Sequence, residues 1–176
     1  MPKLLRGEPV RVVATDLEHN SVIRPFRTLE SLGAEVVFVP LDPGTGVADP
    51  HQFAEALGPE TTLCAAIHGS NVTGAVQPLA EFGAAAKAND VPFLVDASQT
   101  FGRISVDVEA MQIDMLAFSG HKYLLGPLGT GGLWVRDHLS LMPLRDGGTG
   151  SMSELEYQPE CWPDRFEPGS HNITGL

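Results

Sequence analysis

Short apolar runs alternate with segments of helical character along most of this 176-residue chain. The expected strands span residues 10–14, 35–40, 63–67, 92–96, 115–119 and 131–135. The expected helices between them span residues 20–32, 50–56 and 78–89, and Asp49 is the expected cap of the second one. Such alternation of strand and helix is typical of a parallel β-sheet covered by helices, so we predict an α/β fold.

The overall composition limits the classes of partner. Hydrophobic residues make up 43% of the chain and charged residues 19%, which indicates a globular protein. The net charge of -11 argues against nucleic acid or an anionic membrane as the main partner. No apolar run approaches the ~20 residues of a membrane span, and residues 1–7 turn polar too soon for a signal peptide. The two cysteines form no metal pattern, so we expect a cytoplasmic protein without a metal site.

The residue composition of the sequence changes near Asp146. Residues 146–150 are mostly glycine and small polar residues, and residues 157–176 are rich in turn formers. We therefore divide the chain into residues 1–145, the main body, and residues 146–176, a functional loop region rather than a second domain.

The strongest functional signal is a carboxylate and a lysine at the ends of neighbouring expected strands. Asp96 closes the run 92–95, and Lys122 belongs to the segment Ser119-Gly120-His121-Lys122 that follows the run 115–118. The carboxyl ends of parallel strands meet at one edge of a sheet, where open α/β folds bind ligands. Pyridoxal 5'-phosphate requires a lysine for a Schiff base, a carboxylate for its ring nitrogen and donors for its phosphate. We predict that this edge binds that cofactor.

Further polar side chains follow other expected strands. Gln99 lies three residues after Asp96, Asn71 lies in the loop 68–74, and His19 lies between the first strand and the first long helix. An imidazole at such a place can stack on an aromatic ring or move protons. Ser119 and His121 flank a glycine and are suited to a phosphate.

Each of these residues also has a purely structural interpretation. Lys122 fits a surface lysine, the loop 68–74 an ordinary polar loop, and Asp96 a helix cap. Asn20 or Ser21 is an equally good helix cap beside His19. A dinucleotide-binding module is disfavoured, because no Gly-x-Gly-x-x-Gly follows the first strand.

Taken together, the motifs resemble those of the class V aminotransferases, pyridoxal-phosphate enzymes of fold type I, and particularly of cysteine desulfurases and selenocysteine-lyase-like members. The matching segments, in the order of the family, are residues 18–21, 70–74, 95–99, 119–122 and 165–170. They extend over nearly the whole chain. The resemblance implies a three-layer sandwich with a mostly parallel central sheet, of which residues 1–145 are the central part of the cofactor-binding domain.

The resemblance also implies a role for each matching residue. Lys122 carries the cofactor and moves the α-proton, while His19 stacks on the ring and assists proton transfer. Asp96 pairs with the ring nitrogen, and Gln99 and Asn71 contact the ring oxygen or the substrate. Ser119 and His121 hold the phosphate. Ser170 reaches the phosphate of a neighbouring subunit, since the family forms homodimers with sites at the interface.

Family chains are considerably longer than this sequence. We expect the early phosphate loop, the sulfur-accepting cysteine and the arginine for the substrate carboxylate to lie outside it. Cys64 reads as a core residue, and Cys161 is in the wrong place for the persulfide cysteine. The implied function is conversion of L-cysteine to L-alanine, with transfer of the sulfur to a sulfur acceptor protein. The alternatives are another substrate of a related lyase or aminotransferase, and an incomplete fragment that needs a complementary half.

Overall fold

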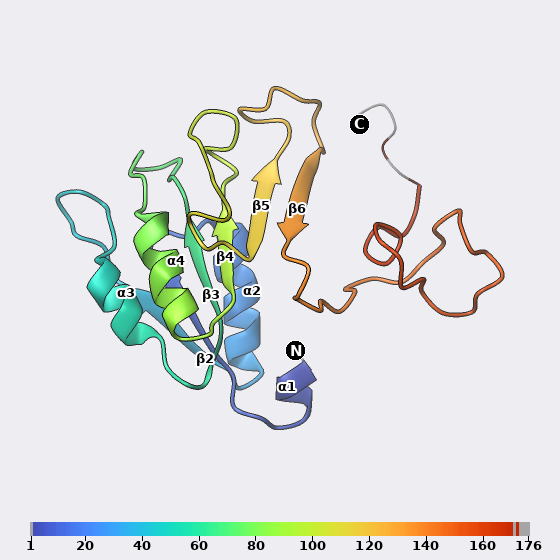
Figure 1. Ribbon diagram of the computed structural model, residues 1–176, viewed down its shortest axis with the longest axis horizontal. Coiled ribbons are helices and arrows are strands. Elements are labelled where there is room, and N and C mark those ends of the chain that lie inside the picture. Colours follow the sequence, from blue (N-terminus) through green and yellow to red (C-terminus); the bar gives the residue numbers. More distant parts are fainter. Residues whose placement is uncertain (1, 171, 173–176) are drawn as a thin grey trace.

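The computed structural model of this protein describes residues 2–170 and 172. Its strands are β1 (Arg11–Thr15), β2 (Glu35–Val39), β3 (Thr61–Ile67), β4 (Phe93–Asp96), β5 (Met115–Ser119) and β6 (Gly131–Val135). Its helices are α1 (Pro2–Leu5), α2 (Asn20–Ser31), α3 (Pro50–Ala56) and α4 (Leu79–Ala88). The strands form one sheet in the order β2-β1-β3-β4-β5-β6 (Figure 1). The first five are parallel, and β6 alone pairs antiparallel with β5.

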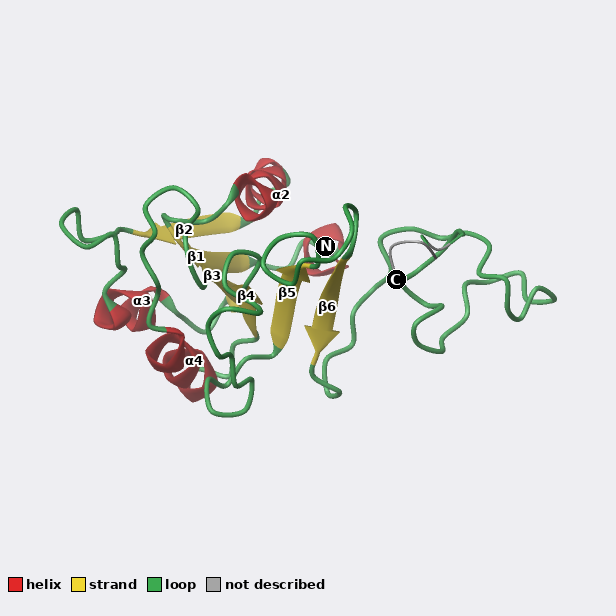
Figure 2. Cartoon of the chain, turned by 90° about the horizontal axis from the view of Figure 1, so that it is seen from above, coloured by secondary structure: helices red, strands yellow, loops and turns green. Residues whose placement is uncertain are grey.

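Helices cover both faces of this sheet, which makes three layers. Helix α2 lies on one face, and α3 and α4 lie side by side on the other (Figure 2). The predicted three-layer α/β sandwich with a mostly parallel sheet is therefore confirmed.

Two apolar clusters hold the layers together. Phe53 of α3 and Phe82 of α4 are fully buried, and their rings stack with centroids 4.3 Å apart. On the opposite face, Phe26 of α2 packs against Val12 and Ala14 of β1. Strand residues alternate between the two clusters, as expected for a sheet buried on both faces. Cys64 is fully buried in the first cluster, as predicted.

The predicted elements are all present, with ends that differ by one or two residues. Strand β1 begins at Arg11 and ends at Thr15, one residue later than predicted. The predicted end residues Pro78 and Asn89 are the caps of α4 rather than part of it. Asp49 caps α3 as predicted, since its side chain accepts a hydrogen bond of 2.9 Å from the backbone nitrogen of His51. The four-residue helix α1 has no counterpart among the predicted elements.

The chain beyond Val135 contains no helix or strand among residues 136–170 and 172. It runs away from the sheet as a series of turns (Figure 1). Residues 171 and 173–176 of the loop region expected after Asp146 lie outside the described residues, and the division of the chain at that point stays a prediction. Across the described residues, no helix has the length and apolar character needed to span a bilayer.

Candidate active site

Four parallel strands deliver their carboxyl ends to the same edge of the sheet. These ends are Thr15, Ile67, Asp96 and Ser119. Between β1 and β3 the chain reverses its direction of travel across the sheet, since β2 lies on one side of β1 and β3 on the other. Ligands of open α/β folds bind in the crevice beside such a reversal.

A cavity of about 620 Å³ opens at this edge, on the α2 side of β4 and β5. Leu94 and Ala117 line it from the sheet, while Val22 of α2 and His19 just before that helix line it from the other side. Helix α2 packs on β1 and β2, so the cavity occupies the neighbouring part of the same face. Its volume falls within the range of sites for small molecules and cofactors.

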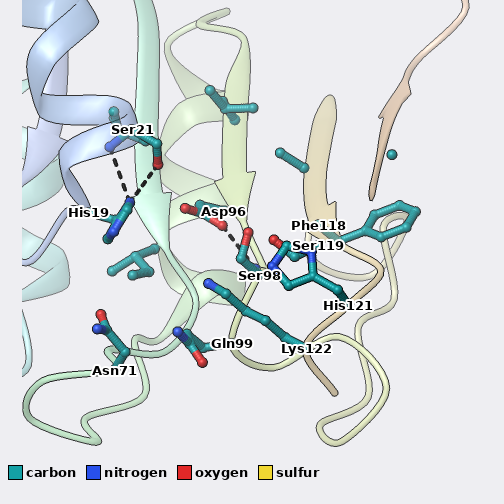
Figure 3. A pocket seen from close by; sticks show the side chains of 15 residues that line it. His19, Ser21, Asn71, Asp96, Ser98, Gln99, Phe118, Ser119, His121 and Lys122 are labelled. Atoms are coloured by element: carbon teal, nitrogen blue, oxygen red, sulfur yellow. Dashed lines mark hydrogen bonds between the residues drawn. The ribbon is translucent and has the colours of Figure 1, made fainter. Parts of the chain in front are cut away.

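Asp96 is the acidic group of the cavity. The residue is only 8% exposed, and its Oδ1 accepts a hydrogen bond of 2.9 Å from the backbone nitrogen of Ser98. The residue therefore caps the turn that begins at Ala97 and also faces the cavity (Figure 3). The structural interpretation of Asp96 as a cap and the functional one as a carboxylate of the site are thus compatible. The carboxylate is anchored through one oxygen, which fixes its direction for a partner in the cavity.

Lys122 reaches the same cavity from the loop after β5. Its side chain extends into the space that His19, Asn71 and Gln99 surround (Figure 3). It is half-buried, unlike the typical surface lysine. A cationic amine and a carboxylate from adjacent strand ends thus share one cavity.

The loop that carries Lys122 requires a glycine at position 120. Gly120 is buried against Thr130, and an added Cβ would lie 2.4 Å from the Thr130 hydroxyl. Its nitrogen donates to the Thr130 carbonyl oxygen at 2.8 Å, and its own carbonyl accepts from Gly126 at 2.8 Å. This close packing fixes Ser119 and His121 at the mouth of the cavity, which both of them line.

His19 is the N-cap of α2. Its Nδ1 accepts a hydrogen bond of 3.2 Å from the backbone nitrogen of Ser21 and lies 2.8 Å from the Ser21 hydroxyl (Figure 3). The alternative in which Asn20 or Ser21 caps this helix does not hold, because the imidazole of His19 takes that position. With Nδ1 used as an acceptor, Nε2 is the nitrogen that faces solvent or a ligand.

Asn71 and Gln99 stand between this cavity and a second one of about 540 Å³, and both residues line both cavities. A buried pair lies beneath their loops: Nδ1 of His68 is 2.8 Å from the Thr100 hydroxyl. Burial lowers the pKa of His68, which favours the neutral imidazole in this pair. The pair joins the loop after β3 to the turn after β4.

Glu18 is a buried acid to which the sequence reasoning gave no role. Its side chain is only 5% exposed, and its Oε1 accepts hydrogen bonds from the Thr15 hydroxyl at 2.7 Å and the Ile67 nitrogen at 2.8 Å. Burial raises the pKa of Glu18 to about 7, and the negative charge of Asp96 acts in the same direction. Its place in the matching segment 18–21, directly before His19, was the signal in the sequence that pointed to it.

The structure brings most of the predicted site residues together. Those that line the main cavity are His19, Asn71, Asp96, Gln99, Ser119, His121 and Lys122. Ser170 is exposed and does not line it. Ser21 and Ser98 line it as well, and the sequence reasoning gave neither a role at the site.

The donor set of the cavity fits pyridoxal 5'-phosphate. Asp96 supplies an oriented, nearly buried carboxylate for a protonated ring nitrogen, and Lys122 supplies the amine. Ser119 and His121 supply donors for a phosphate beside the close-packed Gly120. The apolar side chains of Leu94 and Val22 provide surface for a ring.

Comparison with known proteins also points to a family of pyridoxal-phosphate enzymes. The family model described as Aminotransferase class-V matches residues 6–176. A probable cysteine desulfurase of Methanothermobacter thermautotrophicus is 39% identical over 169 residues, which are 94% of this chain and 42% of that protein. The cysteine desulfurase IscS of Dictyoglomus turgidum is 36% identical over 165 residues, which are 94% of this chain and 38% of that protein.

Solved structures agree in fold. The structure described as SspA in complex with cysteine has a TM-score of 0.83 and 32% identity, and the match covers 99% of this chain and 46% of that one. The apo cysteine desulfurase of Thermococcus onnurineus NA1 has a TM-score of 0.79 and 30% identity, with 95% and 42% covered. The chain thus spans less than half the length of these relatives. On the family match and these identities, the chain belongs to the class V aminotransferase family, whose members use pyridoxal 5'-phosphate.

Proposed function

We propose that this chain carries the cofactor-binding half of a cysteine desulfurase-like enzyme, which converts L-cysteine to L-alanine and passes on the sulfur. The observation that supports this most is the shared cavity of Lys122 and Asp96, at the edge where four strand ends meet. The relatives named cysteine desulfurase supply the substrate class. The chain spans less than half of their length, so we propose the activity for the protein that contains this cofactor site rather than for these residues alone.

Bound pyridoxal 5'-phosphate supplies an electron sink for a carbanion at the α-carbon of an amino acid. In the proposed mechanism, Asp96 holds a proton at the ring nitrogen through its carboxylate. Lys122 would hold the cofactor through Nζ, and the same nitrogen, once free as a neutral amine, would accept the α-proton of the substrate. His19, which lines the cavity, would contact the ring and would move protons through Nε2.

The remaining residues of the cavity orient the ligand. Gln99 and Asn71 donate hydrogen bonds to the ring oxygen or to the substrate, from either side of the opening into the second cavity. Ser119 and His121 bind the phosphate, and the packing of Gly120 against Thr130 holds these two donors in place. A preorganised donor set of this kind lowers the cost of binding.

Neither cysteine of the chain fits the step that accepts sulfur. Cys64 is fully buried, and burial raises the pKa of its thiol. Cys161 is exposed in the segment after Val135 and does not line the cavity. The nucleophilic thiolate therefore comes from another part of the assembled protein, and a sulfur acceptor protein receives the sulfur.

We further propose that the active assembly is a homodimer, with Ser170 placed at the phosphate of the neighbouring subunit. Ser170 is exposed and lies outside the cavity of its own chain, which fits such a role. Loops at the carboxyl edge of the sheet expose Val72, Leu125 and Leu128, each more than four-fifths accessible. Exposed apolar side chains of this kind mark interaction surfaces. Sedimentation velocity tests the proposal, and a monomer at all concentrations would contradict it.

The function is tested on the protein together with the part that supplies the sulfur-accepting cysteine, by adding pyridoxal 5'-phosphate, L-cysteine and a thiol reductant that releases the sulfur as sulfide, and measuring alanine and sulfide. We expect both products in equal amounts, and neither with Lys122→Ala. Lys87→Ala, which alters an exposed lysine of α4, is the matched control and keeps the activity. Alanine without sulfide, or turnover of another amino acid, would favour a related lyase or aminotransferase. A cofactor that binds without any turnover would favour the alternative that a complementary half-chain is required.

A further inference from the structure

Glu18 has a feature that its hydrogen bonds leave unexplained. Its Oε1 takes both donors, Thr15 Oγ1 and the nitrogen of Ile67. Its Oε2 is also buried, but among the described residues it has no hydrogen-bond partner. A buried carboxylate oxygen without a donor is costly, because a charged group loses its hydration there. A proton on Oε2 removes that charge and leaves both bonds to Oε1 intact.

The position of Glu18 links it to the site. Its acceptor oxygen binds the nitrogen of Ile67, and Ile67 is the register partner of Asp96 in the pairing of β3 with β4. The next residue in the chain is His19, the cap of α2. The same carboxyl group therefore joins the end of β1 to the end of β3, directly beside two residues of the cavity.

The charged groups around Glu18 are few. Asp96 on β4 acts on it electrostatically and disfavours a second negative charge. Thr15 on β1 and Ile67 on β3 contribute only uncharged donors. At the start of α2, His19 turns its Nδ1 toward Ser21, and Lys122 approaches from the loop after β5. Two carboxyl groups thus lie at this edge, both of them buried, and the negative charge of Asp96 adds to the burial that disfavours ionisation of Glu18.

We propose that Glu18 is a positioning residue that holds a proton on Oε2 while Asp96 is the single anion of the site, and that Glu18 releases this proton when a cation pairs with Asp96. On release, the O–H bond at Oε2 breaks, the proton passes to the buffer, and the electron pair stays on the carboxylate. The part of this inference that concerns cofactor binding rests on the proposed function. The coupling between the two carboxyl groups does not.

The coupling is tested without cofactor. We would label the glutamate side-chain carboxyl carbons with carbon-13 and follow their chemical shifts against pH in the folded protein. Glu18→Gln identifies the resonance, and Glu60→Gln, at an exposed glutamate in the turn before β3, is the control that leaves it in place. We expect a midpoint of about 7 for Glu18. If Glu18→Gln does not fold, the absence of any glutamate resonance with a midpoint well above the ordinary value of about 4.3 would overturn the proposal.

The variant Asp96→Asn provides a second test of the interaction between the two carboxyl groups. Asparagine keeps an oxygen acceptor for the Ser98 nitrogen but removes the negative charge. We expect the Glu18 midpoint to move to lower pH in this variant. An ordinary midpoint for Glu18 in the unaltered protein, or an unchanged midpoint in Asp96→Asn, would overturn the proposal.

Cofactor binding gives the third arm. Calorimetric titration with pyridoxal 5'-phosphate at pH 7, in two buffers of different ionisation enthalpy, counts the protons released. We expect more release from the unaltered protein than from Glu18→Gln, and equal release would overturn the cofactor-linked part of the inference. If the cofactor fails to bind at all, the proposed function fails, while the carbon-13 titrations decide the coupling independently.

Discussion

Replacing Glu18 with glutamine should change the way in which the stability of this protein depends on pH. Glutamine keeps an oxygen acceptor for Thr15 and Ile67, and its uncharged amide resembles the protonated acid. Burial raises the pKa of Glu18 from 4.5 to about 7. At 1.36 kcal/mol per pKa unit, this corresponds to about 3 kcal/mol of folding free energy.

The direction in which stability changes with pH follows from proton binding. Folded Glu18 holds its proton more tightly than the unfolded chain does. Its stabilising contribution is therefore complete below pH 4.5 and is lost progressively as the pH rises to about 7. Glu18→Gln has no such loss, because glutamine does not titrate. His68, with its lowered pKa, has the opposite dependence, but it is present in both proteins and cancels in the comparison.

The assay is urea denaturation followed by circular dichroism, at several pH values between 4.5 and 8. From the lowest to the highest pH, the unaltered protein should lose about 3 kcal/mol relative to Glu18→Gln. Glu60→Gln, at the exposed control position, should parallel the unaltered protein. A free-energy difference between the unaltered protein and Glu18→Gln that stays constant across this range would refute the reasoning.

Three further substitutions test other parts of the structure. Phe82→Ala removes a fully buried ring from its stack with Phe53 and should lower the free energy of unfolding by about 3–5 kcal/mol in the same assay, whereas a loss below about 1 kcal/mol would contradict the description of the core. Gly120→Ala places a Cβ 2.4 Å from the Thr130 hydroxyl and should weaken cofactor binding in a fluorescence titration, while Gly148→Ala, where an added Cβ meets nothing within 4 Å, should not. Asp96→Asn removes a charged hydrogen-bond partner worth about 1.5–3 kcal/mol and should raise the dissociation constant of the cofactor about 10- to 100-fold, so that unchanged affinity would argue against its pairing with the ring nitrogen.

Much of the fold could be predicted because its strands are buried on both faces. Continuous apolar runs such as 63–67 and 115–118 can hardly be placed elsewhere than in the middle of a covered sheet. The ends of elements were less predictable, because capping depends on side-chain geometry. His19 serves as the cap of α2 through Nδ1, although Asn20 and Ser21 are the commoner cap types.

The sequence could predict the part of the site that depends only on which strands are neighbours, because alternating strands and helices place successive strands side by side. Asp96 and Lys122 lie at the ends of strands that neighbour each other in both sequence and space, so their meeting could be expected. The role of Glu18 could not be predicted, because its buried carboxyl group is held by Ile67, which lies 49 residues further along the chain. The pairing of His68 with Thr100 is likewise a contact across 32 residues that no local pattern reveals.

The central claim is that Lys122 and Asp96 belong to one cofactor site. It is tested most directly by titrating the protein with pyridoxal 5'-phosphate, reducing the complex with borohydride and mapping the modified peptide by mass spectrometry. The claim predicts a visible absorbance band and a label on Lys122 alone, both of which Lys122→Ala abolishes. Labelling spread over several lysines, with no band that depends on Lys122, would contradict it.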